Sequence, residues 1–286
     1  MKVLVANIED VMREAAARWT LLAYFFLSTV FLVIFASAIN LDIVDGALAG
    51  AKLFGKEVDM GGSEVSIEKL VLGVETGFSG FLYVFCTFLA IFATAHLVPR
   101  MQEKGTIDLY LARPVSRVRL LMSRYVAGLI LAGSNVVYLM GSIWIIVGSK
   151  TGVWNARFLL AGSIIFLVIA VLLAFAFMVG VFTSSTAVSI MATYGIFFFG
   201  LMLAAHDKFA AAVSKQWQAN VIETLYWIFP KTAELLTAVV AFVGGNFDEM
   251  PQRILQSLAP APFLTTAAFG VGCLILASWM FTRKEF

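Results

Sequence analysis

Long apolar runs separated by shorter polar segments set the pattern of this 286-residue chain. Charge-free runs cover residues 19–41, 76–99, 125–149 and 158–205, and a last run ends at Thr282. A membrane-spanning helix needs about 20 such residues. The 48 residues of 158–205 are too many for one span, and the polar section 183–186 predicts a break into two. The pattern therefore predicts an all-α polytopic membrane protein with six transmembrane helices.

Residues 1–18 combine apolar and charged positions with helical spacing. Leu4, Ile8, Val11 and Ala15 recur every three or four residues, which places them on one helix face. We expect an amphipathic elbow helix along the membrane surface before the first span, with a plain helical extension into the cytosol as the alternative. Residues 36–38 are similar to a signal-peptide cleavage site, but the acidic residues upstream favour an uncleaved span.

Two further regions separate the spans. Residues 42–75 form a polar loop with seven acidic residues against three lysines. Residues 206–262, before the last span, are cut by Pro230 and by Gly244 and Gly245 into pieces too short to cross. We therefore expect re-entrant or interfacial helices in 206–262, with a seventh and an eighth crossing as the alternative.

Basic residues are concentrated in 100–119 and just beyond, between the second and third spans. The tail adds Arg283 and Lys284. Because Lys and Arg favour the cytoplasmic side, we expect both termini and this section in the cytoplasm and residues 42–75 outside. The chain is 61% hydrophobic and 13% charged, against about 45–50% and about 25% in soluble proteins, which indicates a multi-pass protein of the cell (inner) membrane. The basic residues between these spans are Arg100, Lys104, Arg113, Arg117, Arg119 and Arg124.

The sequence predicts no catalytic, cofactor or metal site on this chain. Residues 50–57 come within one residue of a phosphate-binding loop, but Glu57 stands where a Ser or Thr must bind Mg. We also expect no strand before this section. His96 and His206 are expected on opposite sides of the membrane, so they cannot share a metal ion. Nothing in the pattern calls for a nucleic-acid partner.

The predicted spans themselves contain no Asp, Glu, Lys or Arg, which argues against a proton relay or an ion-coupled transporter. Cys86 and Cys273 lie in apolar runs and are interpreted as small buried hydrophobes rather than a disulfide. Four glycines in the spans are interpreted as helix-packing contacts: Gly128, Gly133, Gly195 and Gly200.

The section EKGTIDLYLARPVSR, residues 103–117, predicts a short helix on the cytoplasmic side. Asp108 falls in its first turn and Arg113 in its last, which suits the helix dipole, and Pro114 ends it. A helix over 106–113 would be roughly 12 Å long, too short to cross a membrane or to be stable alone. Its apolar residues, among them Leu109 and Tyr110, need a surface to pack against, so we interpret it as a docking helix.

This section resembles the cytoplasmic segment of ABC-2 type ABC transporter permeases, whose pattern is similar to E-x-G-T-x-E-x-L-L-x-x-P-V-S-R. Asp108 replaces the usual Glu and Tyr110 a usual Leu. The amphipathic start, the six spans and the basic tail extend the resemblance over the whole chain. Eight residues stand at matching places: Glu103, Gly105, Thr106, Leu111, Pro114, Val115, Ser116 and Arg117.

The resemblance implies a half-transporter that pairs with a second copy or a paralogous permease. Each permease would bind a separate soluble ATP-binding cassette ATPase, which carries the ATP and Mg, and would move an unidentified substrate. The re-entrant helices would close the outer side. The residues implied to couple to the ATPase are Glu103, Gly105, Thr106, Asp108, Leu109, Tyr110, Leu111, Arg113 and Pro114.

Two other classes stay open. One is a secondary transporter or channel, which the charge-free spans disfavour. The other is a non-transporting membrane scaffold or mechanotransmitter, in which an ATPase acts through the membrane on an extracytoplasmic partner of the acidic loop.

Overall fold

The computed structural model describes residues 19–44, 47–53, 56–57, 67–103, 105, 116–213, 215–245 and 251–284. The expected elbow helix 1–18 and most of the docking section lie outside these residues. The described helices are α2 (Trp19–Ala38), α3 (Ile67–Thr94), α4 (Leu97–Met101), α6 (Arg117–Thr151), α7 (Ala156–Thr183), α8 (Thr186–Leu203), α9 (His206–Ala212), α10 (Gln216–Ile228), α11 (Thr232–Gly244), α12 (Gln252–Ser257) and α13 (Pro260–Arg283); the strands are β1 (Ile39–Val44), β2 (Ala47–Leu53) and β3 (Lys56–Glu57).

The predicted polytopic helical fold is confirmed. Among the described residues, five segments are long and apolar enough to cross a membrane: Glu68–Met101, α6, α7, α8 and Ile254–Arg283. These correspond to five of the six predicted spans. The remaining one is α2, a 20-residue helix whose apolar section Leu22–Ser37 is shorter than the other five segments.

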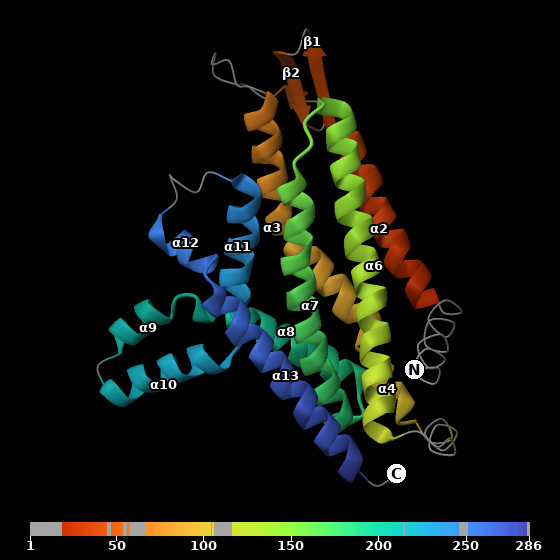
Figure 1. Ribbon diagram of the computed structural model, residues 1–286, viewed down its shortest axis with the longest axis vertical. Coiled ribbons are helices and arrows are strands. Elements are labelled where there is room, and N and C mark those ends of the chain that lie inside the picture. Colours follow the sequence, from red (N-terminus) through yellow and green to blue (C-terminus); the bar gives the residue numbers. More distant parts are fainter. Residues whose placement is uncertain are drawn as a thin grey trace.

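Helix α7 forms the centre of the bundle. It contacts α3, α6, α8, α11 and α13, and Figure 1 shows it (green) between α3, α6 and α13. Its side chains are apolar almost throughout, as expected for a helix surrounded by protein and lipid. Phe158, Ile165 and Phe177 are fully buried along its length. The core is therefore built around α7, and a movement of α7 must displace the helices packed on it.

The break at 183–186 is confirmed. Helix α7 ends at Thr183, Ser184 adopts a left-handed backbone with φ 53°, and α8 begins at Thr186. Ser185 caps α8 by accepting a hydrogen bond from the Val188 amide, as Ser commonly does at helix starts. Region 206–262 is likewise cut where expected, since α10 and α11 meet at a bend of 57° beside Pro230.

A small antiparallel sheet lies in residues 39–57, where the sequence predicted only a polar loop. The strand order is β1-β2-β3, with Ile39 opposite Leu53 and Lys52 opposite Glu57. The sheet lies at the end of the bundle farthest from the C-terminus (Figure 1). Strand β2 is ALAGAKL, rich in Ala and Gly, which are uncommon in strands, so the pattern did not reveal it.

Two helices start earlier than predicted, which corrects the expectation of charge-free spans. Helix α3 begins at Ile67 and α6 at Arg117, so Glu75 and Arg124 lie inside membrane-crossing segments. Both side chains are buried, with exposed fractions of 1% and 2%. Glu75 accepts a hydrogen bond of 2.7 Å from Asn155 Nδ2, and Arg124 Nη1 donates one of 3.3 Å to the Leu97 carbonyl. Partners near the helix ends explain why charged residues are tolerated there.

The glycines of the spans differ in what surrounds them. A Cβ on Gly128 would lie 3.1 Å from Leu173 Cδ2, and one on Gly133 would lie 2.9 Å from Phe166 Cε2, so both allow α6 to approach α7 closely. A Cβ on Gly200 would overlap Thr232 Oγ1 and would lie 2.8 Å from the Pro230 carbonyl oxygen. The packing interpretation therefore holds for these three. For Gly195, nothing among the described residues of the chain lies within 4 Å of the Cβ position, so packing inside the described bundle gives no reason for glycine there.

The different surroundings of Gly200 and Gly195 allow two alanine variants to be compared. Gly200→Ala is expected to destabilise the protein by about 1–3 kcal/mol, because the methyl group overlaps a backbone carbonyl that cannot rotate away. Gly195→Ala, five residues earlier in α8, is expected to leave stability unchanged or slightly raised. Thermal unfolding of both variants in lipid nanodiscs measures the effect. Equal unfolding temperatures would contradict the close approach of α8 to residues 230–232.

Candidate functional site

Helix α4 and the start of α6, which flank the docking section in the chain, lie at the end of the bundle opposite the sheet (Figure 1). Glu103 is exposed, and its amide donates to the Arg100 carbonyl at 3.2 Å. Gly105 has φ 85°, a backbone conformation that costs less free energy for glycine than for other residues. This explains why glycine suits this position of the motif. The other residues implied to couple lie outside the described part of the chain: Thr106, Asp108, Leu109, Tyr110, Leu111, Arg113 and Pro114.

The chain enters the section through a buried short helix. Helix α4 buries Leu97, Val98, Pro99 and Met101, and it contacts α6, α7 and α8. A five-residue helix is held by such packing rather than by its own hydrogen bonds. The start of the section is therefore fixed against three helices of the membrane domain.

Gln102, the residue before the motif, joins this entry to the turn between α7 and α8. Its Nε2 donates to the Gly180 carbonyl at 2.9 Å. Its Oε1 accepts from the Ser184 hydroxyl at 3.1 Å and from the Lys284 ammonium at 2.6 Å. One amide side chain thus links α4, the end of α7 and the residue that follows α13.

The chain leaves the section through the start of α6. Ser116 caps this helix by accepting a 3.4 Å hydrogen bond from the Arg119 amide. Arg117 Nη1 donates to the carbonyls of Lys284 at 2.5 Å and Thr282 at 3.3 Å. The exit of the section is therefore tied to the end of α13.

Lys284 connects the entry and the exit. Its ammonium donates to Gln102 Oε1 at 2.6 Å, the Val181 carbonyl at 2.6 Å and Ser184 Oγ at 2.7 Å. These three bonds use all its donors, and carbonyls at the end of a helix favour a cation. Burial lowers the pKa of the Lys284 ammonium below its usual value. We call Gln102, Arg117, Ser184 and Lys284 the anchor network.

Sequence reasoning missed most of this network. Arg117 belonged to the motif, but Lys284 entered only as a basic residue in the tail, and Gln102 had no assigned role. Lys284 lies 182 residues from Gln102, so no local pattern joins them. The adjacency of Gln102 to the motif was the one available signal.

The arrangement allows force to pass from the docking section to the helices of the bundle. The section leaves and re-enters the membrane domain within one hydrogen-bonded cluster, so a force applied to it acts on α4, α6, the α7–α8 turn and α13 together. Because α7 is the centre of the core, the cluster connects the section with the whole bundle.

The section that resembles a phosphate-binding loop does not have that geometry. Residues 50–53 lie in β2, paired with β1, and Lys56 and Glu57 form β3. A strand therefore does precede this section, contrary to the expectation. A phosphate-binding loop runs from a strand through a glycine-rich loop into a helix, whereas these residues continue from one strand into another.

A search of curated protein sequences finds no match to this chain. The family model of the ABC-2 family transporter protein matches residues 12–286, nearly the whole chain and all of the described helices. The match includes the docking section and both sides of the anchor network. The chain belongs to the ABC-2 family of transporter proteins, and it is a multi-pass membrane permease component of an ABC transporter.

Proposed function

We propose that this permease uses ATP hydrolysed by a separate, soluble ATP-binding cassette subunit, which docks on residues 103–114, to move a substrate across or out of the membrane. A second copy or a paralogous permease completes the transporter in the cell membrane. Both termini and the docking section face the cytoplasm, and the sheet of residues 39–57 faces outward. The observation that carries the proposal is the match of residues 12–286 to the ABC-2 transporter family, and the anchor network supports it by holding both ends of the docking section.

The proposed mechanism follows from these contacts. ATP-driven closure of two ATPase subunits pulls on the docking sections of two permeases. Each section is short, and its ends meet in one cluster, so it passes the displacement on instead of absorbing it. Buried helix α4 then shifts against α7 and α8 while Arg117 and Lys284 carry α6 and α13 along. The bundle opens and closes as packed helices slide, as in shear motions.

The second candidate function is a mechanotransmitter acting on an extracytoplasmic partner. The observation in its favour is the sheet at the far end of the bundle, which continues directly from α2 at Ile39. It requires the same docking section and ATPase, so the anchor network supports both candidates equally.

ATP turnover tests whether a separate subunit, and not this permease, hydrolyses the ATP. The purified chain alone is expected to hydrolyse no ATP, and it should co-purify with the ATPase subunit when the two are co-expressed. The measurements are phosphate release by the chain in nanodiscs and affinity capture of the complex. Phosphate release by the chain alone, persisting after further purification, would overturn the proposal.

A further inference from the structure

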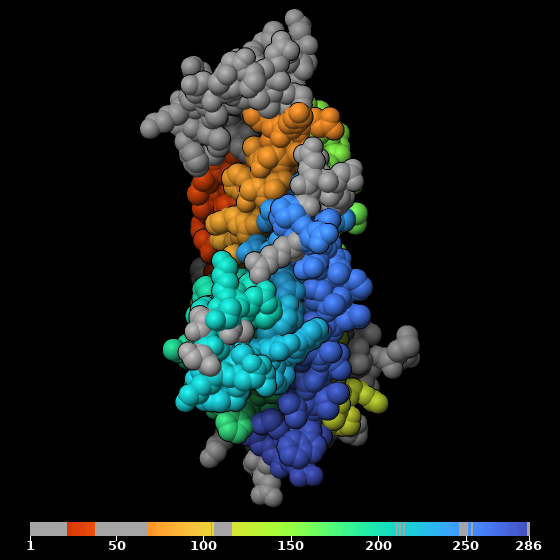
Figure 2. Space-filling view, turned by 90° about the vertical axis from the view of Figure 1, so that its left-hand side faces the viewer, coloured from red at the N-terminus to blue at the C-terminus, as the bar shows by residue number. Residues whose placement is uncertain are grey.

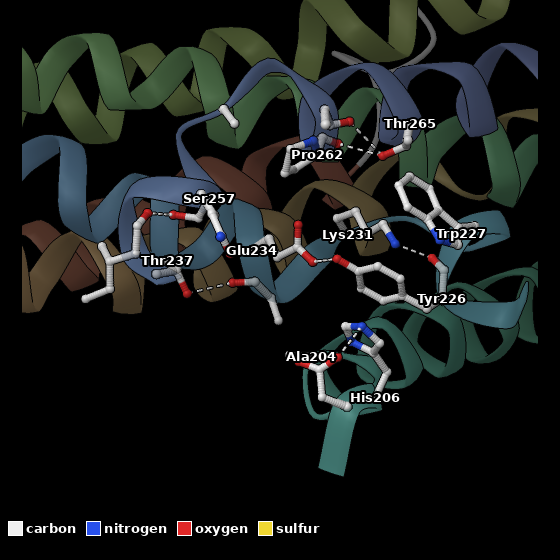
Figure 3. Close-up of a pocket in the computed structure, with 16 residues that line it drawn as sticks. Ala204, His206, Tyr226, Trp227, Lys231, Glu234, Thr237, Ser257, Pro262 and Thr265 are labelled. Carbon is white, nitrogen blue, oxygen red and sulfur yellow. Dashed lines mark hydrogen bonds and ion pairs between the residues drawn. The ribbon is translucent and has the colours of Figure 1, made fainter. Parts of the chain in front are cut away.

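A cavity of about 510 Å³ lies away from the anchor network, where α9, α10, α11, α12 and α13 meet (Figure 3). Figure 2 shows α9 and α10 in cyan and α12 and α13 in blue on the same face of the molecule. This volume lies in the range of about 300–1,000 Å³ typical of small-molecule sites. The proposed function makes no use of this cavity.

One wall holds an ammonium group against an aromatic ring. Lys231, in the link between α10 and α11, is only 5% exposed. Its Nζ lies 2.8 Å from the centroid of the Tyr226 ring and also donates to the Tyr226 carbonyl. The His206 ring stacks on Tyr226 at 3.6 Å between centroids, and Figure 3 shows Lys231 and His206 on opposite sides of the ring. The chain therefore has a cation–π site that its own lysine fills.

The three hydroxyl groups that line the cavity are left mainly as hydrogen-bond acceptors. The Thr237, Ser257 and Thr265 hydroxyls donate to the carbonyls of Ala233, Ile254 and Ala261 at 3.0, 2.5 and 2.9 Å. Their protons are thereby used, while their oxygen lone pairs can still accept. A ligand that brings positive charge or donor groups therefore fits these walls better than an anion.

The charged groups of the cavity also favour a cationic ligand. Glu234 accepts from the Tyr226 hydroxyl, and Asp207 lies 3.0 Å from His206 Nε2. Among the described lining residues, the one lysine is Lys231, whose ammonium already contacts the Tyr226 ring. The described lining residues of α12 and α13 carry no charge, and Ile254, Ala259, Ala261 and Pro262 among them offer apolar surface.

We propose that this cavity binds an organic cation with an apolar body, an amine or quaternary ammonium compound, whose charged centre takes the place of the Lys231 ammonium over Tyr226. The apolar body lies against the α12 and α13 wall and Trp227. Binding is a property of this chain alone and does not depend on the ATPase. If the proposed transport function proved wrong, cation binding would still be expected. If no cation bound, the proposed function would be unaffected.

The test uses the full chain in lipid nanodiscs and three probes of similar size. Benzyltrimethylammonium is the cation, neopentylbenzene its neutral isostere and benzenesulfonate the anion. Equilibrium dialysis against protein-free nanodiscs corrects for lipid partitioning. The cation is expected to bind saturably and about fivefold more tightly than either other probe. Absence of saturable cation binding, or equal or tighter binding of benzenesulfonate, would overturn the proposal.

Two substitutions separate a cation site from an anion site held by Lys231. Lys231→Met removes the competing ammonium and is expected to strengthen cation binding about fivefold, whereas an anion site would be lost. Glu234→Gln removes a carboxylate and is expected to weaken cation binding several-fold, which tests the same claim if Lys231→Met does not fold. Lys208→Met is the matched control, because this exposed α9 lysine does not line the cavity. Weaker cation binding in folded Lys231→Met, or unchanged binding in Glu234→Gln, contradicts the proposal.

The pH dependence gives an independent readout. Burial lowers the pKa of Lys231 to about 8, a shift that the nearby Glu234 partly offsets. The ammonium is therefore lost as the pH rises through about 8, and binding of the permanently charged probe should strengthen from about pH 7 to about pH 9. The other titratable groups among the described lining residues are His206, Asp207, Tyr226 and Glu234. In Lys231→Met this increase should disappear; an increase that persists there would assign it to another group and count against the role of Lys231.

Discussion

Replacing Leu109 with Asp is expected to weaken binding of the ATPase subunit about a hundredfold, equivalent to about 2.8 kcal/mol. If this apolar side chain of the docking section inserts into a groove of the ATPase, the substitution places an unpaired carboxylate in a desolvated interface. Such burial costs several kcal/mol before relaxation. Affinity capture of the co-expressed ATPase, together with ATP turnover of the complex, measures the loss, and membrane insertion of the permease should be unaffected.

Two controls accompany this variant. Leu53→Asp places the same substitution in β2, at the opposite end of the bundle, and should leave ATPase binding intact. Glu103→Ala removes an exposed carboxylate and should cost at most about 1 kcal/mol, because exposed ion pairs contribute little. Normal assembly and turnover of Leu109→Asp would show that the section is only a basic cytoplasmic loop.

Lys284→Met is expected to leave ATPase binding intact but to reduce permease-dependent ATP turnover about thirtyfold. The substitution leaves Gln102 Oε1, Ser184 Oγ and the Val181 carbonyl without their shared donor. Hydrogen bonds to charged groups contribute about 1.5–3 kcal/mol each, and the half-buried position reduces their sum to about 2 kcal/mol, or about thirtyfold. The measurement compares turnover of the complex with turnover of the ATPase alone.

Arg283→Met is the matched control for this variant. It removes a neighbouring basic charge whose guanidinium lies over the Trp279 ring at 4.4 Å and takes no part in the anchor network. If both variants reduce turnover equally, the tail acts through its charge and not through the hydrogen bonds of Lys284. If neither reduces it, the anchor network does not carry the coupling.

The features of the helical bundle that depend on residues close together in the sequence could be predicted. A run of polar hydroxyl residues within 158–205 placed the α7–α8 break correctly, because such residues and a left-handed Ser184 end a helix within a few positions. Pro230 and the glycines at 244–245 marked the ends of α10 and α11 for the same reason. Hydropathy alone located five crossing segments because the bilayer fixes their length.

Features that depend on distant partners were not predictable. The sequence placed Glu75 in a loop, because a charged residue normally ends a membrane span. In the structure Glu75 lies inside α3, where it accepts a hydrogen bond from Asn155, 80 positions away. The anchor network joins residues up to 182 positions apart in the sequence, and neither Gln102 nor Lys284 belongs to a periodic pattern. The cavity beside Lys231 forms only when five helices meet. Side-chain partners of this kind are set by tertiary packing, which a single sequence does not display.

Helix α6 runs without a break for 35 residues, from Arg117 in the anchor network to Thr151, and it contacts strand β1 of the sheet. At 1.5 Å per residue it is about 52 Å long, well beyond the hydrocarbon thickness of about 30 Å. In the proposed mechanism it acts as a stiff lever arm with its fulcrum in the core. A tilt of about 5° about the middle of the helix displaces each end by about 2.3 Å in opposite directions, so in the proposed orientation a small stroke at the cytoplasmic end becomes mechanical work outside the lipid.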